Sequence, residues 1–260
     1  MINQLKLVIM LFSICYISLV NASPYQLNLS NELIYLGTGA SMSLIGYMNE
    51  QKRDAPSLND IAIQNKNPDF EQRFTGNWNT TASKISDVML YAGVLSPLSL
   101  ASVIKDDYFV LTILYLETIA LTGGGMALAK GTITRYRPYT YDKNAPLSAK
   151  LSRENNRSFF SGHAALATSG FVFSATVFSD YYPNSKYKPW VWASAIAASA
   201  TTGILRVAAG KHFPSDVLVG FAWGASIGYW IPTLHKKERD FMFFPFDNGR
   251  QRGVGVMRFF

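Results

Sequence analysis

The sequence predicts an all-α fold, a bundle of five to six apolar helices, and three observations support this. Apolar residues make up 48% of the 260 residues and charged residues only 16%, whereas about a quarter is usual in soluble domains. No alternation of apolar and polar residues typical of strands persists through the middle of the chain. The apolar residues instead gather in five segments, each near the ~20 residues that a helix needs to cross a bilayer: 86–104, 108–130, 161–181, 190–208 and 215–234. A soluble bundle with a core of the same length is the alternative, because mean hydropathy is only +0.08.

The first 22 residues have the layout of a secretory signal peptide. Lys6 is followed by an apolar run from Leu7 to Val20 and by a small-residue site that ends at Ala22. Cleavage after Ala22 is the favoured interpretation, and an uncleaved first transmembrane helix is the alternative. The only cysteine, Cys15, lies in this segment, so a cleaved chain would have neither disulfides nor thiol chemistry.

The rest of the chain divides into three parts. Residues 23–85 form an N-terminal region with a short apolar helix at 32–48, which suits a buried or interfacial helix and is marginal for a span. Residues 86–237 form the helical bundle. Residues 238–260 form a polar and aromatic tail that we expect to be extended or disordered.

Charged and polar residues cluster at the ends of the apolar segments. Such groups are costly beside apolar helices unless they are paired or functional. In an up-and-down bundle, the junction after 108–130 and the junction after 190–208 lie at the same end. We therefore expect six residues to meet in one pocket there: Lys130, Arg137, His163, Arg206, His212 and Asp216.

Three cations and two histidines around one pocket would repel each other unless an anion lay among them. A phosphate suits this arrangement, because arginine offers paired donors and a helix N-terminus offers free N–H groups. A neutral His212 can attack phosphorus, and Asp216, four residues later, can fix its tautomer and orientation. His163 can protonate the departing alkoxide. The arginines can stabilise the transition-state charge, so this chemistry needs no metal.

Three sequence blocks resemble the type 2 phosphatidic acid phosphatase superfamily, which shares its site with vanadium-dependent haloperoxidases. They have the order and spacing of that family, over roughly residues 108–234: Lys130 followed by Arg137-Pro138, then Ser161-Gly162-His163, then Arg206, His212 and Asp216. The resemblance implies a phosphatase with neither cofactor nor metal, acting through a phosphohistidine. It implies His212 as nucleophile, Asp216 as its orienting group and His163 as general acid. It implies that the phosphate is held by Lys130, Arg137, Ser161, Gly162 and Arg206.

Two positions depart from the family pattern. Phe160 stands where a proline usually precedes Ser-Gly-His, and Leu205 stands where a serine usually precedes the arginine. Phe160 removes no reacting group, whereas Leu205 removes a hydroxyl that could bind phosphate or support Arg206. We expect a differently tuned site, not an inactive one.

The expected substrate is a phosphorylated lipid, resembling phosphatidic acid, an isoprenyl diphosphate or lipid A, or else a small phosphate ester. The expected location is the bacterial inner membrane, with the site facing the periplasm. A soluble periplasmic acid phosphatase of broad specificity is the alternative, and a catalytically silent membrane binding protein is a remoter one. The net charge of +7 favours acidic partners, but no basic run interleaved with aromatics indicates nucleic acid.

Several further residues have more than one interpretation. Arg135 and Lys143 are expected to be solvated or to face lipid headgroups. Glu117 is expected either to support the arginines of the pocket or to make a helix-packing hydrogen bond. His235 is expected to belong to a charged helix end. Trp190 and Trp192 fit an interfacial aromatic belt or the core equally well.

Overall fold

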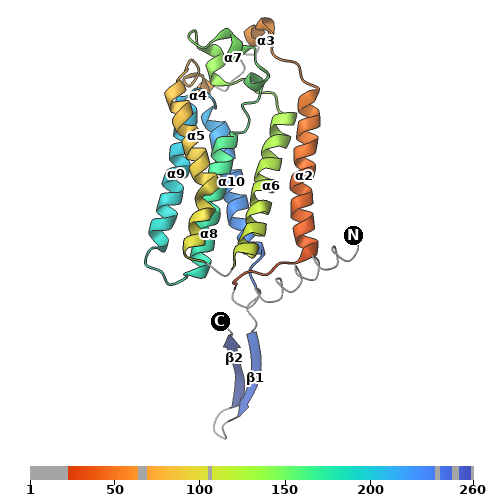
Figure 1. Ribbon diagram of the computed structural model, residues 1–260, viewed down its shortest axis with the longest axis vertical. Coiled ribbons are helices and arrows are strands. Elements are labelled where there is room, and N and C mark those ends of the chain that lie inside the picture. Colours follow the sequence, from red (N-terminus) through yellow and green to blue (C-terminus); the bar gives the residue numbers. More distant parts are fainter. Residues whose placement is uncertain (1–22, 64–68, 105–106, 238–240, 248–251, 259–260) are drawn as a thin grey trace, which may run out of the picture.

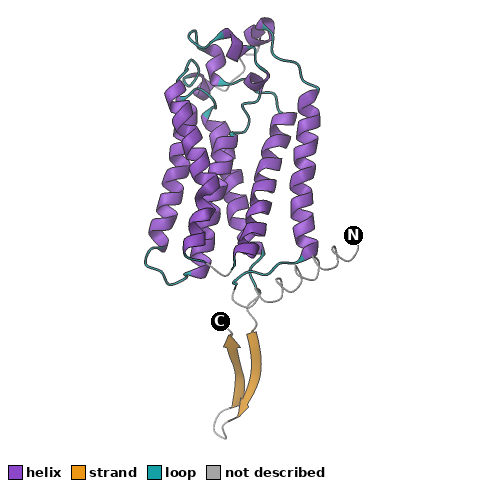
Figure 2. Ribbon diagram, in the orientation of Figure 1, coloured by secondary structure: helices purple, strands orange, loops and turns teal. Residues whose placement is uncertain are grey.

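The structure is a computed structural model that describes residues 23–63, 69–104, 107–237, 241–247 and 252–258. The predicted signal peptide, residues 1–22, lies outside the described residues. The described part is helical apart from one hairpin (Figure 2). Its long helices lie side by side as an up-and-down bundle (Figure 1), which confirms the predicted all-α fold. Six of the described helices have 16 residues or more: α2 (Leu29–Gln51), α5 (Thr80–Leu95), α6 (Tyr108–Thr132), α8 (Gly162–Tyr181), α9 (Lys188–Ala208) and α10 (Pro214–Leu234).

The segment predicted as a short helix at 32–48 is the full-length bundle helix α2, with 23 residues. At 1.5 Å per residue it is about 34 Å long, and it packs along α6. Asn28 caps its start by accepting a hydrogen bond from the amide of Ser30. The helix predicted from the apolar residues was too short because the first and last turns of α2 are polar. The N-terminal region predicted as 23–85 therefore contains all of α2 and the first residues of α5, and both helices belong to the bundle.

The helix predicted from residue 86 begins earlier, at Thr80, because Asn79 caps it and accepts from the amide of Ala82. It ends at Leu95, and Pro97 follows in the 3₁₀-helix η1 (Ser96–Ser102). Proline disfavours a continuing α-helix because it lacks an N–H donor. The remaining predicted segments match α6, α8, α9 and α10 to within a few residues.

Short elements cover one end of the bundle (Figure 1). They lie between α2 and α5 and between α6 and α8: α3 (Leu58–Ile63), α4 (Asp69–Gln72), η2 (Pro138–Tyr141), α7 (Leu147–Lys150) and η3 (Arg153–Asn156). The C-terminal tail extends from the opposite end as an antiparallel hairpin of β1 (Phe241–Asp247) and β2 (Arg252–Arg258) (Figure 1).

Three of the described helices, α6, α9 and α10, are long and apolar enough to cross a membrane. This is fewer than the five segments predicted from length, because α5 has only 16 residues and α8 carries many hydroxyl groups and glycines. The outer surface still exposes large apolar side chains, including Leu33, Leu218 and Trp230. Trp190 is exposed near the start of α9, whereas the indole of Trp192 donates to Ser179 at 2.9 Å. These features are those of a membrane protein.

Glycines let three pairs of helices approach backbone to backbone. On α10, Gly220 and Gly228 face the carbonyl oxygens of Ser161 and Ser169, where an added Cβ would lie 2.7 and 2.5 Å away. Gly93 of α5 meets α8 at Ala167, where a Cβ would lie 2.5 Å from the Cα. The helix α8 therefore lies at the centre of the bundle, and most of its side chains are buried. Small residues at such interfaces are typical of membrane helices.

The glycines of α2 provide a matched test of this packing. We expect Gly46→Ala to lower the thermal unfolding midpoint in detergent, because its Cβ would lie closer than 3.0 Å to the backbone of Ala127. Gly37→Ala should leave the midpoint unchanged or raise it, since no atom lies within 4 Å of that position and alanine favours a helix over glycine by about 1 kcal/mol. Equal midpoints for the two variants would contradict the close contact between α2 and α6.

Candidate active site

The predicted site residues lie at the covered end of the bundle. Lys130 is in the last turn of α6, His163 is the second residue of α8, Arg206 is in the last turn of α9 and Asp216 is in the first turn of α10. These helix ends point to the same end of the bundle (Figure 1). The charges of Arg137, Arg206, Lys130 and His163 all act on His212, so the structure brings the predicted residues together around that imidazole.

The imidazole of His212 is buried, with 1% of its surface exposed. Its Nδ1 lies 2.7 Å from the carbonyl oxygen of Ser158, and a carbonyl accepts only from a protonated nitrogen, so Nδ1 carries the hydrogen and Nε2 carries the lone pair. Burial, followed by the positive charges of Arg137, Arg206 and Lys130, lowers the pKa of His212 well below its usual value. A neutral ring with a free Nε2 lone pair is the form that a nucleophile requires.

The carboxylate of Asp216 does not bind His212 directly, contrary to the sequence prediction. Its Oδ2 lies 3.8 Å from Nδ1 of His212, beyond hydrogen-bond distance. Asp216 turns back to cap α10 and accepts from the amide of Phe213 at 2.9 Å and from the hydroxyl of Ser158 at 2.5 Å. Because the carbonyl of Ser158 accepts from His212, Asp216 orients the ring through Ser158.

Asp216 also binds Arg135, which the sequence reasoning wrongly expected to be solvated. The guanidinium donates to Oδ1 of Asp216 at 2.5 Å and to the hydroxyl of Ser215 at 2.7 Å. Its other nitrogen forms an ion pair with Glu71. Glu71 is fully buried and accepts from the amide of Ser215 at 3.0 Å. No sequence signal identified Glu71, because it lies in a polar segment without a motif and is buried only by tertiary contacts.

Arg206 is 4% exposed and is held from a neighbouring helix. One of its terminal nitrogens donates to the hydroxyl of Ser86, on α5, at 3.1 Å, and its Nε has no hydrogen-bond partner within the described ranges. Ser86 thus supplies the hydroxyl that Leu205 lacks. This contact lies outside the family blocks, since it joins helices that are distant in sequence.

Asp87 is a site residue that the sequence analysis missed. Its Oδ1 lies 2.7 Å from Nε2 of His163 and 3.6 Å from a terminal nitrogen of Arg206. The Asp87 side chain is 47% exposed, so its carboxylate reaches into the pocket from one side. An internal anion therefore lies between two of the groups expected to meet the substrate phosphate.

Arg137 and Lys130 occupy the wall formed by α6 and the segment that follows it. Arg137 is 7% exposed and donates from Nε to the carbonyl oxygen of Glu154 at 2.8 Å. Its terminal nitrogen pairs with the Glu154 carboxylate at 3.2 Å, and that side chain is 62% exposed. The amino group of Lys130 lies 3.8 Å from the position that a Cβ would take at Gly162. The absence of a side chain at Gly162 therefore leaves room for Lys130 beside the start of α8.

Ser161 and Phe160 serve mainly to build the site. The hydroxyl of Ser161 accepts from the amide of Ala164 and caps α8, and its own amide donates to the carbonyl of Asp216 at 3.0 Å. Phe160 is buried and packs against Phe159 and Trp223. Its surroundings are thus protein and not solvent, so the departure at Phe160 alters packing behind the pocket.

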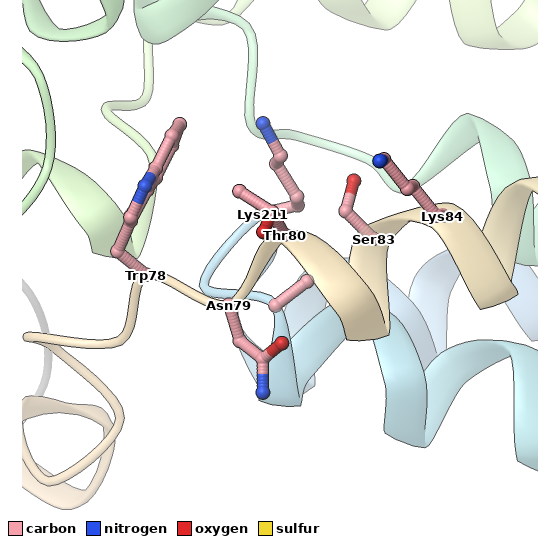
Figure 3. Close-up of a pocket in the computed structure, with 7 residues that line it drawn as sticks. Trp78, Asn79, Thr80, Ser83, Lys84 and Lys211 are labelled. Atoms are coloured by element: carbon pink, nitrogen blue, oxygen red, sulfur yellow. The ribbon is translucent and has the colours of Figure 1, made fainter.

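A cavity of about 210 Å³ adjoins this site. Figure 3 shows the amino groups of Lys84 and Lys211 and the hydroxyl of Ser83 on the same side of the cavity, with Trp78 beside Lys211. The Lys211 amino group lies 4.8 Å from the ring of Trp78 and 5.0 Å from that of Tyr139. Burial, followed by Arg137 and Arg206, lowers the pKa of Lys211 to about 8.

Two residues weighed in the sequence analysis lie away from the site. Glu117 is fully buried and lies near His235, 3.3 Å from its Nε2, so the expectation that it supports the arginines of the pocket is wrong. His235 caps the end of α10 beside Lys236 and Lys237, which agrees with the predicted charged helix end, and its side chain is buried, with 3% of its surface exposed. Lys143 is exposed, as predicted.

Comparison with known proteins gives one family and several relatives. The model of the PAP2 superfamily matches residues 111–240. A lipid A 1-phosphatase from Porphyromonas gingivalis is 32% identical over 113 residues, which is 42% of this chain and 23% of that protein. A phosphatidylglycerophosphatase B from Bacillus subtilis is 33% identical over 97 residues, which is 37% of this chain and 48% of that protein. The chain thus spans less than half of either curated relative.

Among solved structures, the chain is similar to a transmembrane PAP2-type phosphatidylglycerolphosphate phosphatase from Bacillus subtilis. The TM-score is 0.44 and the sequence identity is 22%, over 79% of this chain and 94% of that chain.

The buried neutral His212 predicts a pH-dependent part of the stability. Its pKa is lowered in the folded protein, so the unfolded chain binds the extra proton below pH ~6.5. The contribution of His212 to the free energy of unfolding is therefore fully present above that pH. It decreases as the pH falls, by up to about 1.4 kcal/mol per pH unit. We expect the thermal midpoints of wild type and His212→Gln to converge on acidification from pH 7 to 5. Parallel curves would contradict a neutral buried ring.

Proposed function

The chain belongs to the PAP2 superfamily, and on that premise we propose that it is a metal-independent phosphatase of lipid phosphates that acts through a phosphohistidine. The observation that carries the proposal is the buried His212, with its Nε2 lone pair free and with Arg137, Arg206 and Lys130 acting on it. A cationic pocket of this kind concentrates a phosphate dianion beside a neutral nucleophile.

The proposed reaction has two displacements at phosphorus. The Nε2 lone pair of His212 forms an N–P bond while the bond from phosphorus to the ester oxygen breaks, and His163 gives its proton to the departing alkoxide. Water then attacks the phosphohistidine, the N–P bond breaks, and His163 takes a proton from the water. The products are the dephosphorylated alcohol and inorganic phosphate, or a monophosphate and inorganic phosphate when the substrate is a diphosphate.

The cations and the start of α8 stabilise the charge that develops on the phosphate oxygens. Arg137, Arg206 and Lys130 supply donors that are fixed before the substrate arrives, so little reorganisation is needed. The amide of Gly162 lies at the N-terminus of α8, which favours anions, whereas the amide of Ser161 is already bound to the carbonyl of Asp216. Asp216 holds this assembly together, because it binds Ser158, Arg135 and the start of α10 at once.

A lipid substrate is supported by the relatives, whose names denote a lipid A phosphatase and a phosphatidylglycerol phosphate phosphatase. The site lies at the end of apolar helices, where a lipid phosphate would reside. The adjoining cavity, with Lys84, Lys211 and Trp78, suits the neighbouring polar part of the headgroup, either a second phosphate or a sugar. We therefore favour substrates such as an isoprenyl diphosphate or lipid A over simple esters.

A soluble periplasmic phosphatase of broad specificity is the second candidate. It is favoured by the mean hydropathy of +0.08 and by the finding that only three described helices meet the requirements for a span. The same site chemistry would serve both proteins. Release from cells by osmotic shock without detergent would support this candidate over the membrane enzyme.

We further propose an inner-membrane location with the site facing the periplasm. The six long helices of the bundle then place the start of α2 and the end of α10 on the cytoplasmic side. That side carries Lys186, Lys188, Lys236 and Lys237, and the site end carries many lysines and arginines as well, so the proposal does not rest on the positive-inside rule. The sequence reasoning reached the same location with 32–48 lying on the surface. The same reasoning expected a spanning 32–48 to turn the site toward the cytoplasm, because it placed residue 23 outside, whereas the present proposal places residue 23 on the cytoplasmic side.

The catalytic roles predict distinct kinetic effects. We expect His212→Ala to lower kcat on a lipid phosphate by at least about a thousandfold and Arg137→Ala by about a hundredfold, because each removes a contact to the transition state. Lys211→Ala, at the adjoining cavity, should mainly raise KM. Turnover by wild type should be blocked by vanadate and should persist with a chelator. More than a tenth of wild-type activity in His212→Ala would refute the role of His212 as nucleophile. If wild type hydrolyses neither phosphatidic acid, phosphatidylglycerol phosphate, isoprenyl diphosphate nor lipid A, the result would favour a catalytically silent binding protein.

The proposed orientation predicts which surfaces an impermeant maleimide labels in spheroplasts. In a Cys15→Ser background, we expect Asn144→Cys, at the site end, to be labelled and Asn184→Cys, between α8 and α9, to be protected until the membrane is permeabilised. Both residues are exposed, so each is the control for the other. Labelling of both would support the soluble enzyme, and labelling of Asn184→Cys alone would place the site in the cytoplasm.

A further inference from the structure

A second cluster of ionisable side chains lies at the opposite end of the bundle from the phosphate site. It comprises Glu32 from the first turn of α2, Glu117 from α6 and His235 from the end of α10. The start of α2 and the end of α10 lie far from the short elements that cover the site (Figure 1). All three side chains are buried, with exposed fractions of 7%, 0% and 3%. Such a group of charges needs a compensating partner.

The geometry of His235 shows what kind of partner is missing. Its Nδ1 lies 2.7 Å from the carbonyl oxygen of Ile231, so Nδ1 carries a hydrogen and Nε2 is the ring atom that faces the two carboxylates. Nε2 lies 3.3 Å from an oxygen of Glu32 and 3.3 Å from an oxygen of Glu117, yet it has no hydrogen-bond partner in the part of the chain that the structure describes. A neutral ring with an Nε2 lone pair facing two carboxylate oxygens would be repelled by them unless a cation lay between the three atoms.

The carboxylates are also unsatisfied. Neither oxygen of Glu117 has a hydrogen-bond partner among the described residues, and the same holds for Oε2 of Glu32. The other oxygen of Glu32 accepts only the amide of Asn28, at 3.0 Å. Buried polar atoms without partners are rare, and here they belong to three residues whose ligand atoms, one from each residue, lie within 4.8 Å of one another.

We propose that Glu32, Glu117 and His235 bind one divalent transition-metal ion, with Zn²⁺ the best match. Two carboxylates balance its charge, and a neutral imidazole with carboxylate oxygens is a ligand set that Zn²⁺ accepts. Ligand atoms about 2.1 Å from such an ion lie about 3.0–3.4 Å apart, and the two separations of 3.3 Å agree with this. The hydrogen bond from Nδ1 to Ile231 is the kind of outer contact that orients a metal-binding histidine.

The role of this ion is structural, and it does not depend on the proposed phosphatase activity. It ties the start of α2 to α6 and to the end of α10, where the chain leaves the bundle for the hairpin. Backbone contacts already join the same segments: the amide of Gln26 donates to the carbonyl of His235 at 2.8 Å, and the amide of Lys237 donates to that of Pro24 at 3.0 Å. A metal bridge among three helices would fix these segments relative to one another.

The test measures metal content and stability in the purified full-length protein. After treatment with chelator, addition of Zn²⁺ and desalting, we expect one zinc per chain by mass spectrometry and a thermal midpoint several degrees above that of the chelated protein. Glu117→Gln and His235→Asn should retain at least tenfold less zinc and lose the shift in midpoint. Asp180→Asn is the matched control, because Asp180 lies at the same end and pairs with Lys236 outside the cluster.

The contrary outcome is a metal-free cluster in which His235 is protonated and shares protons with the two carboxylates. Zinc absent from wild type, or retained equally by Glu117→Gln, would overturn the proposal. Should Glu117→Gln fail to fold, Glu32→Gln replaces it as the test of zinc retention. Turnover at a temperature below unfolding should be equal in the chelated and zinc-loaded proteins, so loss of zinc binding and loss of phosphatase activity are separate results.

Discussion

The contact on which the site depends is the backbone approach of α8 and α10. Gly220, Gly224 and Gly228 form one stripe along α10, and each faces a backbone oxygen of α8. This contact places the first turns of the two helices side by side, and the amide of Ser161 binds the carbonyl of Asp216 there. His163 and His212 belong to these two helix starts, so they meet because the helices touch. Side chains larger than glycine along this stripe would separate them.

Much of the fold and the catalytic constellation could be predicted, because both rest on local patterns. Lys130, Arg137, His163, Arg206 and His212 lie at helix ends that connectivity brings to one end of the bundle. The polar neighbours could not be predicted. Glu71 becomes significant only because Arg135 and the amide of Ser215 reach it, and Asp87 only because α5 packs beside α8 and α9. The length of α2 escaped the hydropathy pattern because its end turns are polar.

The two buried histidines, His212 and His235, make the same kind of hydrogen bond to the backbone but have neighbours of opposite charge. Each donates from Nδ1 to a backbone carbonyl, so that Nε2 faces the neighbouring charged groups. Around His212 the neighbours are cations, which suits a phosphate. Around His235 they are carboxylates, which suits a cation. The same ring orientation therefore supports opposite ligand preferences at the two ends of the bundle, and the charges of the neighbours decide between them.

The position of Asp87 bears on how the pocket discriminates among anions. Its carboxylate already binds Nε2 of His163 and lies 3.6 Å from a terminal nitrogen of Arg206, so an incoming anion would compete with it for these two groups. A singly charged ion such as chloride gains little by that exchange, whereas a phosphate ester brings two charges and more acceptor oxygens. If the pocket binds a phosphate as proposed, this competition would disfavour binding of small singly charged anions beside His212.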